Sequence, residues 1–183
     1  MLQILLYLYQ TRSVGLVLQA GIANRDLTQR SYVDTSYLTH QDSKSYSGYT
    51  MSLGEIGSFC SKSAKQSLVA TSSTHAEMRA VYALTVDIIY MVHLMQELHR
   101  PLLLPCIVFE DNQPVIDLLK DTSARSKRCK HFLMMIDWIR EQVLAGYLQL
   151  IKVPTEENIA DVLTKIVTGG EYRKKASLLL GLG

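Results

Sequence analysis

The order of apolar and polar positions divides the chain into an early run of strands and a later series of alternating helices and strands. Alternation of apolar and polar side chains predicts a strand over residues 31–37. Two more strands are expected over 46–53 and 56–61, where Gly54 would allow a hairpin turn. Residues 68–70 are expected to extend the same sheet. The first part of the chain therefore predicts antiparallel strands.

Apolar residues at helical spacing dominate residues 72–99, and Arg100-Pro101 ends this long predicted helix. The short apolar run 106–109 predicts a buried strand. The remaining expected elements are a helix over 112–120, a helix over 131–145, a strand over 147–153 and a helix over 156–167. Antiparallel strands followed by strand–helix crossovers predict an α/β fold with a mixed sheet and helices on its faces.

Length and composition allow one domain with short appendages. The chain has 183 residues, of which 48% are hydrophobic, so it can bury a sizeable core. We expect an N-terminal helix and connection over 1–28, a central domain over 29–168 and a C-terminal tail over 169–183. The net charge is only +2, so any binding of nucleic acid would need a local basic patch.

Two further classes of protein are disfavoured by the composition. No uninterrupted apolar run approaches the roughly 20 residues that cross a bilayer, so no membrane partner is expected. The apolar opening segment lacks the basic region and cleavage site of a signal peptide. Cys60, Cys106 and Cys129 form no Cys-x-x-Cys pair, so neither a zinc site nor a disulfide framework is expected.

Four acidic residues lie where a sheet fold could gather them. Asp34 lies within the first strand and Glu77 about one turn into the long helix, whereas Asp111 follows the strand 106–109 and Asp161 lies in the last predicted helix. Carboxylates are ligands for Mg²⁺ or Mn²⁺. Two such ions about 4 Å apart can activate water and stabilise the leaving oxygen of a phosphodiester. The pattern favours a metal-dependent nuclease.

Each acid also has an ordinary interpretation. Glu77 could complete a capping box with Thr74, and Asp111 could be the N-cap of the following helix. Asp34 could be an exposed strand residue and Asp161 a solvated helix residue. The spacing of the acids does not decide between these alternatives and a metal centre.

The segments around the acids resemble motifs of ribonuclease H domains from copia-type retrotransposons. Residues 72–78 read Ser-Ser-Thr-His-Ala-Glu-Met, where the family has Ser-Ser-Thr-Glu-Ala-Glu-Tyr. Residues 109–113 are similar to the family's Tyr-Cys-Asp-Asn-Gln, and 128–131 to its Arg-Thr-Lys-His. Residues 153–165 resemble Val-Pro-Thr-Glu-Glu-Gln-Leu-Ala-Asp-Ile-Phe-Thr-Lys, and 42–49 resemble Asp-Arg-Lys-Ser-Thr-Ser-Gly-Tyr. The combination, in this order, is specific.

The resemblance implies a ribonuclease H-like, mixed five-stranded sheet with helices on both faces. It assigns Asp34, Glu77, Asp111 and Asp161 as catalytic residues and as ligands of two Mg²⁺ ions, for which Mn²⁺ can substitute. The implied reaction is hydrolysis of the RNA strand of an RNA–DNA hybrid. Residues 1–28 resemble the end of a reverse transcriptase region, which implies the reverse transcriptase of the same Pol polyprotein as partner. The implied location is cytoplasmic, in a virus-like particle, with a nuclear location as the alternative.

The chain also departs from the family pattern. Where the family has Asp-Ala-Asp-Trp, this chain has Ser36 in place of the second Asp. His75 stands where the family has Glu, and Asp137 stands where many relatives have His. The segment directly before the last predicted helix has no histidine, whereas cellular ribonucleases H have a proton-shuttling histidine there. Glu156 or Glu157 could substitute for it, although both are ordinary helix-start acids. An alternative is therefore a catalytically degenerate, domesticated domain that binds hybrids or a partner protein. An integrase is disfavoured because its order would be Asp, Asp, Glu.

Basic residues near the third motif are candidates for binding the hybrid. The candidate nucleic-acid-binding residues are Lys62, Lys65, Arg125, Lys127, Arg128, Lys130 and His131. Such side chains would neutralise phosphates and make affinity salt-dependent. The alternative is that the short charge run is a solvated basic loop.

Overall fold

A computed structural model describes residues 2–18, 28–38, 42–54, 57–121 and 130–182. The strands are β1 (Thr28–Ser36), β2 (Tyr46–Leu53), β3 (Cys60–Lys65), β4 (Leu103–Glu110) and β5 (Leu148–Lys152). The helices are α1 (Leu2–Gln10), α2 (Ser73–Glu97), α3 (Gln113–Lys120), α4 (Lys130–Leu144) and α5 (Gly169–Leu180). Two short 3₁₀ helices, η1 (Thr155–Glu157) and η2 (Ile159–Leu163), follow β5.

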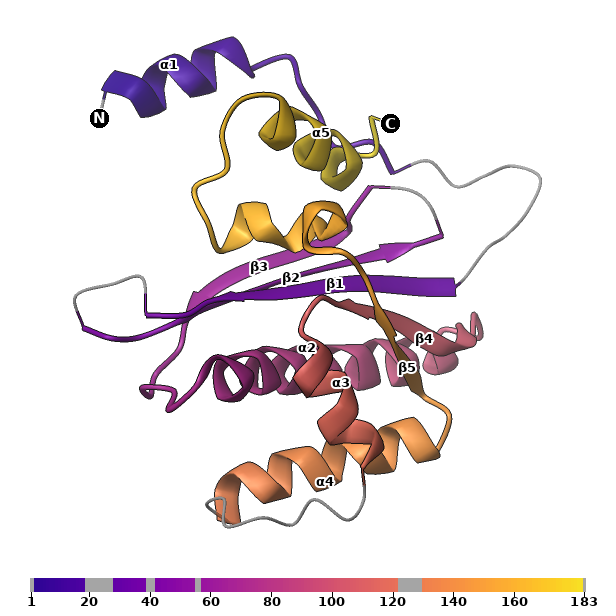
Figure 1. Cartoon of the computed structure of the whole chain (residues 1–183). Coiled ribbons are helices and arrows are strands. Elements are labelled where there is room, and N and C mark those ends of the chain that lie inside the picture. The colour runs from indigo at the N-terminus through magenta and orange to yellow at the C-terminus, as the bar shows by residue number, and fades with distance from the viewer. Residues whose placement is uncertain (1, 19–27, 39–41, 55–56, 122–129, 183) are drawn as a thin grey trace.

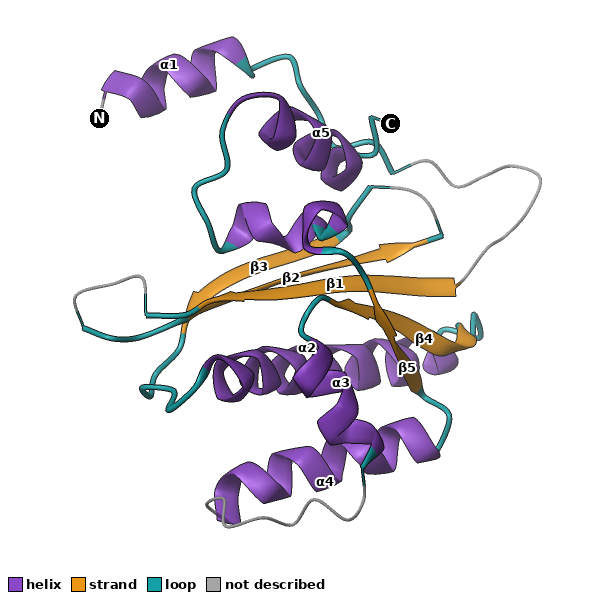
Figure 2. Ribbon diagram, in the orientation of Figure 1, coloured by secondary structure: helices purple, strands orange, loops and turns teal. Residues whose placement is uncertain are grey.

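The strands form one mixed sheet in the order β3-β2-β1-β4-β5, with antiparallel pairing of β1–β2 and β2–β3 and parallel pairing of β1–β4 and β4–β5. Figure 2 shows α2, α3 and α4 below the sheet, and the 3₁₀ helices with α5 above it. This arrangement confirms the mixed sheet predicted from the order of elements, and the five strands implied by the family resemblance. Because β1 and β4 are parallel, their C-terminal ends lie at the same edge of the sheet.

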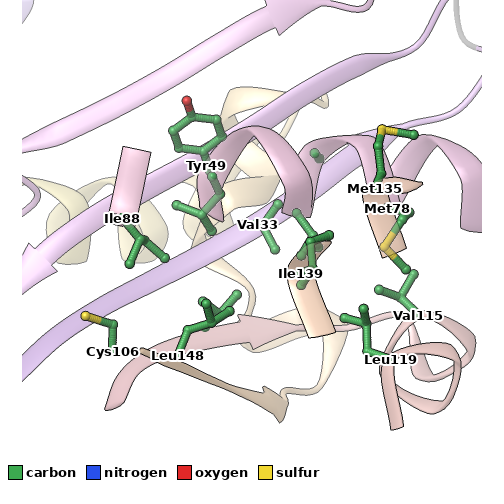
Figure 3. Packing of buried hydrophobic residues seen from close by; sticks show 14 of the residues in the cluster. Val33, Tyr49, Met78, Ile88, Cys106, Val115, Leu119, Met135, Ile139 and Leu148 are labelled. Carbon is green, nitrogen blue, oxygen red and sulfur yellow. The ribbon is translucent and has the colours of Figure 1, made fainter. Parts of the chain in front are cut away.

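The main core lies between the sheet and the lower helices (Figure 3). Its labelled side chains come from all of these elements: Val33, Tyr49, Met78, Ile88, Cys106, Val115, Leu119, Met135, Ile139 and Leu148. Burial of this apolar surface holds α2 across the underside of β1 and β2. Among the described residues, α2 is the helix whose length and mean hydropathy suffice to cross a membrane, and nine of its residues are buried within the domain.

Three expected elements differ in the early part of the chain and after β5. The strand expected over 56–61 begins only at Cys60, because the Ser58 N–H donates to the Leu179 carbonyl at 2.8 Å and not to a strand neighbour. Residues 68–70 do not extend the sheet; the Leu68 carbonyl accepts from Arg79 at 3.0 Å. The helix expected over 156–167 is replaced by η1 and η2.

The segment expected as a C-terminal tail is largely the helix α5, which packs against η2. The sequence did not predict this helix, and the reason is visible in the packing. The buried residue of α5 is Lys175, whose side chain is directed to a carboxylate. A helix held by a buried charge lacks the apolar stripe by which helices are recognised in a sequence.

Candidate metal centre

Three of the four predicted acids meet at one edge of the sheet. Asp34 lies near the end of β1, Asp111 directly follows β4, and Glu77 lies in the N-terminal part of α2 beneath them. One carboxylate oxygen of each residue lies within 4.8 Å of those of the other two. The parallel pairing of β1 with β4 and the packing of α2 on the sheet produce this group. We call it the carboxylate trio.

The ordinary interpretations of these acids do not hold. The N-cap of α2 is Ser72, whose hydroxyl accepts from the His75 N–H at 3.1 Å, so Glu77 lies outside any capping box. The N-cap of α3 is Asn112 and not Asp111. Asp34 is only 1% exposed, which excludes its interpretation as an exposed strand residue. Their positions therefore need an explanation other than helix capping or solvation.

Burial makes the trio unfavourable without a cation. Desolvation raises the pKa of Asp34, although Thr164 and Lys165 oppose the shift. The pKa of Glu77 is raised well above its ordinary value by desolvation, then by the negative charges of Glu110 and Asp34. The Glu77 Oε2 atom is buried and has no hydrogen-bond partner among the described residues. Two buried acids and a half-buried one, with one buried oxygen unpaired, fit a divalent cation.

Asp161, the fourth predicted ligand, lies beside the trio but has a different environment. It is 5% exposed on η2, so it is not a solvated helix residue. Its Oδ1 atom lies 2.7 Å from the Lys165 ammonium, and its Oδ2 atom accepts from Lys175. Lys165 also lies 2.9 Å from Asp34 Oδ1 and so connects Asp161 to the trio. Asp161 is not one of the three acids whose oxygens lie within 4.8 Å of one another.

Two residues that sequence reasoning missed bring η2 over the sheet. Gly48 lies opposite Asp34 on β2, where a Cβ atom would lie 2.6 Å from Thr164 Cγ2 and 2.8 Å from Leu163 Cβ. Asn158 is fully buried and donates to the Val33 carbonyl at 2.8 Å, while it accepts from the Ala160 N–H at 3.1 Å. The Asn158 cap starts η2 and thereby breaks the continuous helix expected here. Gly48 lies within a family-like segment, which was the available signal.

Glu110 is a fifth carboxylate that sequence reasoning did not single out. It is fully buried at the end of β4, and its Oε1 atom accepts from the Asn112 N–H at 2.9 Å. Its Oε2 atom has no partner among the described residues. Desolvation raises its pKa to about 8, with the negative charges of Asp111 and Asp34 acting in the same direction. The signal was an acid in an apolar strand, where the family motif has cysteine.

The predicted nucleic-acid-binding residues are only partly described. Arg125, Lys127 and Arg128 lie outside the described residues, as does the side chain of His131. Lys130 is exposed at the start of α4. Lys62 and Lys65 have acidic neighbours, at 3.8 Å from Asp87 and 2.5 Å from Asp42 respectively. The binding role of these residues remains a prediction. Glu156 and Glu157 are exposed in η1.

Sequence comparison finds relatives among transposon polyproteins, although no protein-family model matches the chain. A retrovirus-related Pol polyprotein from transposon RE1 of Arabidopsis thaliana is 32% identical over 177 residues, which are 96% of this chain and 12% of the relative. The Pol polyprotein from transposon TNT 1-94 of Nicotiana tabacum is 33% identical over 146 residues, or 78% of this chain and 11% of the relative. The chain thus spans about an eighth of the length of these relatives or less.

Solved structures resemble the fold at low sequence identity. LC11-RNase H1 in complex with an RNA/DNA hybrid aligns with a TM-score of 0.55 and 14% identity, over 74% of this chain and 93% of that one. The foamy viral protease-reverse transcriptase in complex with an RNA/DNA hybrid aligns with a TM-score of 0.56 and 15% identity, over 86% of this chain and 22% of that one. The fold is therefore that of the ribonuclease H-like proteins.

The sequence relatives indicate which group of ribonuclease H-like proteins this chain resembles. The homologues are retrovirus-related Pol polyproteins from copia-type transposons, and together with the ribonuclease H-like fold they are consistent with a ribonuclease H domain of such a polyprotein. The resemblance found in the sequence motifs is confirmed.

Proposed function

We propose that the chain hydrolyses the RNA strand of RNA–DNA hybrids as the ribonuclease H domain of a retrotransposon Pol polyprotein. The observation that carries the proposal is the carboxylate trio, whose oxygens lie within 4.8 Å of one another in a ribonuclease H-like fold. Its chain order of Asp, Glu and Asp is the order that the family resemblance requires. Two solved neighbours of the same fold are described as complexes with RNA/DNA hybrids.

The trio would hold the divalent ions, with Asp161 as the fourth ligand. When bound, Mg²⁺ or Mn²⁺, two ions in this proposal, would supply the Lewis acidity needed to activate water and stabilise the leaving oxygen. Asp34 and Glu77 are buried and fixed by packing, whereas Asp111 is half-buried. The scissile phosphate would therefore approach from the side of Asp111.

The turn at Asp111 is fixed by its neighbours on β4 and β5. Glu110 accepts from the Asn112 N–H at 2.9 Å, and the Lys152 ammonium donates to the Asp111 carbonyl. Both contacts hold the backbone, so the Asp111 carboxylate stays close to those of Asp34 and Glu77. A fixed ligand geometry is required because small displacements of metal ligands have large effects on rate.

Basic residues before and at the start of α4 are proposed to bind the hybrid. Lys130 is exposed there, next to the predicted binding residues Arg125, Lys127, Arg128 and His131. Contacts with phosphates would be independent of base sequence and sensitive to salt, while groove shape and 2′-hydroxyls would identify the hybrid. The reverse transcriptase of the same polyprotein is the proposed partner. Cytoplasmic particles remain the proposed location.

The second candidate function is a degenerate, hybrid-binding module. Lys165 lies between Asp34 and Asp161, at 2.9 and 2.7 Å, where it neutralises two of the four predicted ligands. A site permanently closed by this lysine would bind hybrid without cleaving it.

A cleavage assay distinguishes the two candidates. A hybrid labelled on its RNA strand is incubated with the chain and Mg²⁺ or Mn²⁺, and Asp111→Asn is compared with Asp117→Asn. Asp117 is an exposed residue of α3, so it controls for the loss of one carboxylate charge. We expect Asp111→Asn to lower the rate about 100-fold or more, and Asp117→Asn to retain it. Equal rates in the two variants, or binding without metal-dependent cleavage by the parent chain, would reject the enzymatic proposal.

A further inference from the structure

Lys165 contacts two acids of the site at once. Its ammonium lies 2.9 Å from Asp34 Oδ1 and 2.7 Å from Asp161 Oδ1. Both acidic side chains are at most 7% exposed, whereas the Lys165 side chain is 40% exposed. Two buried carboxylates joined by one ammonium need its charge, because they would otherwise repel each other at low dielectric. Lys165 therefore acts as the cation that holds η2 to β1.

The other oxygens of these two acids are also occupied. Asp34 Oδ2 accepts from the Thr164 hydroxyl, and Asp161 Oδ2 accepts from Lys175. A divalent ion held by both Asp34 and Asp161 would therefore compete for oxygens that already have a partner, either those that Lys165 contacts or those with a more deeply buried partner. Since Lys165 is the partly exposed one of the two lysines, it is the group that can move into solvent.

Lys175 differs from Lys165 in its surroundings. Its side chain is 2% exposed, and it contacts Glu171 on its own helix at 3.0 Å in addition to Asp161. The Thr155 carbonyl also accepts from it at 3.4 Å. Displacing Lys175 would separate a buried ammonium from the buried Asp161 Oδ2 atom, which is costly. We therefore expect Lys175 to keep Asp161 in place while Lys165 exchanges.

We propose that Lys165 occupies the position of a cation between Asp34 and Asp161, and that a metal ion binds there only by displacing it. This inference rests on the proposed function, because it concerns the same four acids. A first ion would bind the trio through Glu77 and Asp111, where no lysine contacts the carboxylates among the described residues. Binding of a second ion would be weakened by competition with Lys165. The chain would thus remain assembled, but incompletely loaded, at low metal concentration.

Calorimetric titration with Mn²⁺ alone tests the inference without any substrate. The variants are Lys165→Met, which removes the charge and retains an unbranched chain, and Lys174→Met, an exposed residue of α5 that controls for net charge. We expect the parent and Lys174→Met to bind one ion tightly and a second weakly. Lys165→Met should bind the second ion about tenfold more tightly or better, because the competing ammonium is absent.

A second variant covers the case in which Lys165→Met does not fold without metal. Lys165→Arg retains the charge, so its second ion should bind as weakly as in the parent or more weakly. Thermal unfolding gives the matching readout. Lys165→Met should be less stable than the parent without metal and should gain more from Mn²⁺.

The outcomes separate this inference from the proposed function. If the parent binds Mn²⁺ and Lys165→Met binds it with the same stoichiometry and affinities, the displacement proposal is overturned and the metal centre stands. A second ion that binds Lys165→Arg as tightly as Lys165→Met would also overturn it. If no variant binds Mn²⁺, both the displacement and the metal-dependent function are rejected.

Discussion

The site has two sides that differ in how their buried negative charge is balanced. The strand side comprises Glu110 on β4 and Glu77 on the helix beneath the sheet, and the C-terminal side comprises Asp161 with its two lysines. On the strand side, Glu77 and Glu110 are buried, each retains an oxygen without a partner among the described residues, and each has a raised pKa. On the C-terminal side, Asp161 has a lysine at each carboxylate oxygen. Asp34 lies between the sides and contacts Lys165. The buried carboxylate oxygens that a bound cation would stabilise therefore lie on the strand side.

The difference also reflects how each side is built. The strand side is placed by the hydrophobic core, which packs α2 against the sheet regardless of the charges that it carries. The C-terminal side is placed by polar contacts of Asn158, Lys165 and Lys175. Substitutions that remove a charge should therefore raise the free energy of unfolding on the strand side and lower it on the C-terminal side.

The largest effect is expected from Lys175→Met. The substitution leaves Asp161 with one buried oxygen unpaired and removes the ion pair between α5 and η2, so the free energy of unfolding should fall by about 3–5 kcal/mol. Urea unfolding at pH 7 measures the change, with Lys174→Met on the same helix as the control. Equal stability of the two variants would show that the C-terminal side is not held by this charge.

The next effect concerns the pH dependence of stability and Glu110. Its pKa is raised to about 8 in the folded chain, so the unfolded chain ionises first as the pH rises above the ordinary value of 4.5. The free energy of unfolding should therefore decrease between these values and level off above them. Glu110→Gln lacks this ionisation, and we expect it to be about 2–3 kcal/mol more stable than the parent at pH 9.

Unfolding curves of the parent and Glu110→Gln at pH 4 and pH 9, without metal, give this comparison. The difference should be small at pH 4, where the carboxyl is neutral in both states. A constant difference at both pH values would mean that Glu110 ionises normally, and the charge imbalance on the strand side would lose its main support.

A smaller effect is expected where the two sides meet. Gly48→Ala would place a methyl group 2.6 Å from Thr164 Cγ2, so η2 must move away from β2. We expect the free energy of unfolding to fall by about 2 kcal/mol. Cleavage should fall as well, because Asp161 moves with η2. Gly15→Ala is the matched control, since its Cβ would meet nothing within 4 Å. A Gly48→Ala variant as stable and active as Gly15→Ala contradicts the close approach.

The smallest expected effect has the opposite sign. Glu77→Gln should stabilise the metal-free chain by about 1 kcal/mol at pH 8, because burial raises the pKa of Glu77 and penalises its charged form. Asp161→Asn should destabilise it, because a lysine loses its charged partner. Unfolding in the presence of a chelator measures both. If both substitutions changed the free energy of unfolding in the same direction, the two sides would not differ in how their charge is balanced.

The sequence predicted the parts of this site that periodicity and chain order specify. Parallel strands after a crossover place Asp34 and Asp111 at one edge, and a long apolar helix places Glu77 beneath them. The C-terminal side was beyond such reasoning, because α5 has a lysine as its buried residue. The break between η1 and η2 depends on a single buried side chain, that of Asn158, which contacts a strand 125 residues away.

The central claim is that the carboxylate trio binds a divalent metal ion, and metal-dependent thermal unfolding tests it most directly. Parent, Asp111→Asn and Asp117→Asn are unfolded with and without Mn²⁺ at one ionic strength. The account predicts that saturating Mn²⁺ raises the melting temperature of the parent and of Asp117→Asn by about 5 °C or more. The gain should be largely lost in Asp111→Asn. No gain in the parent, or the same gain in all three proteins, would contradict the account.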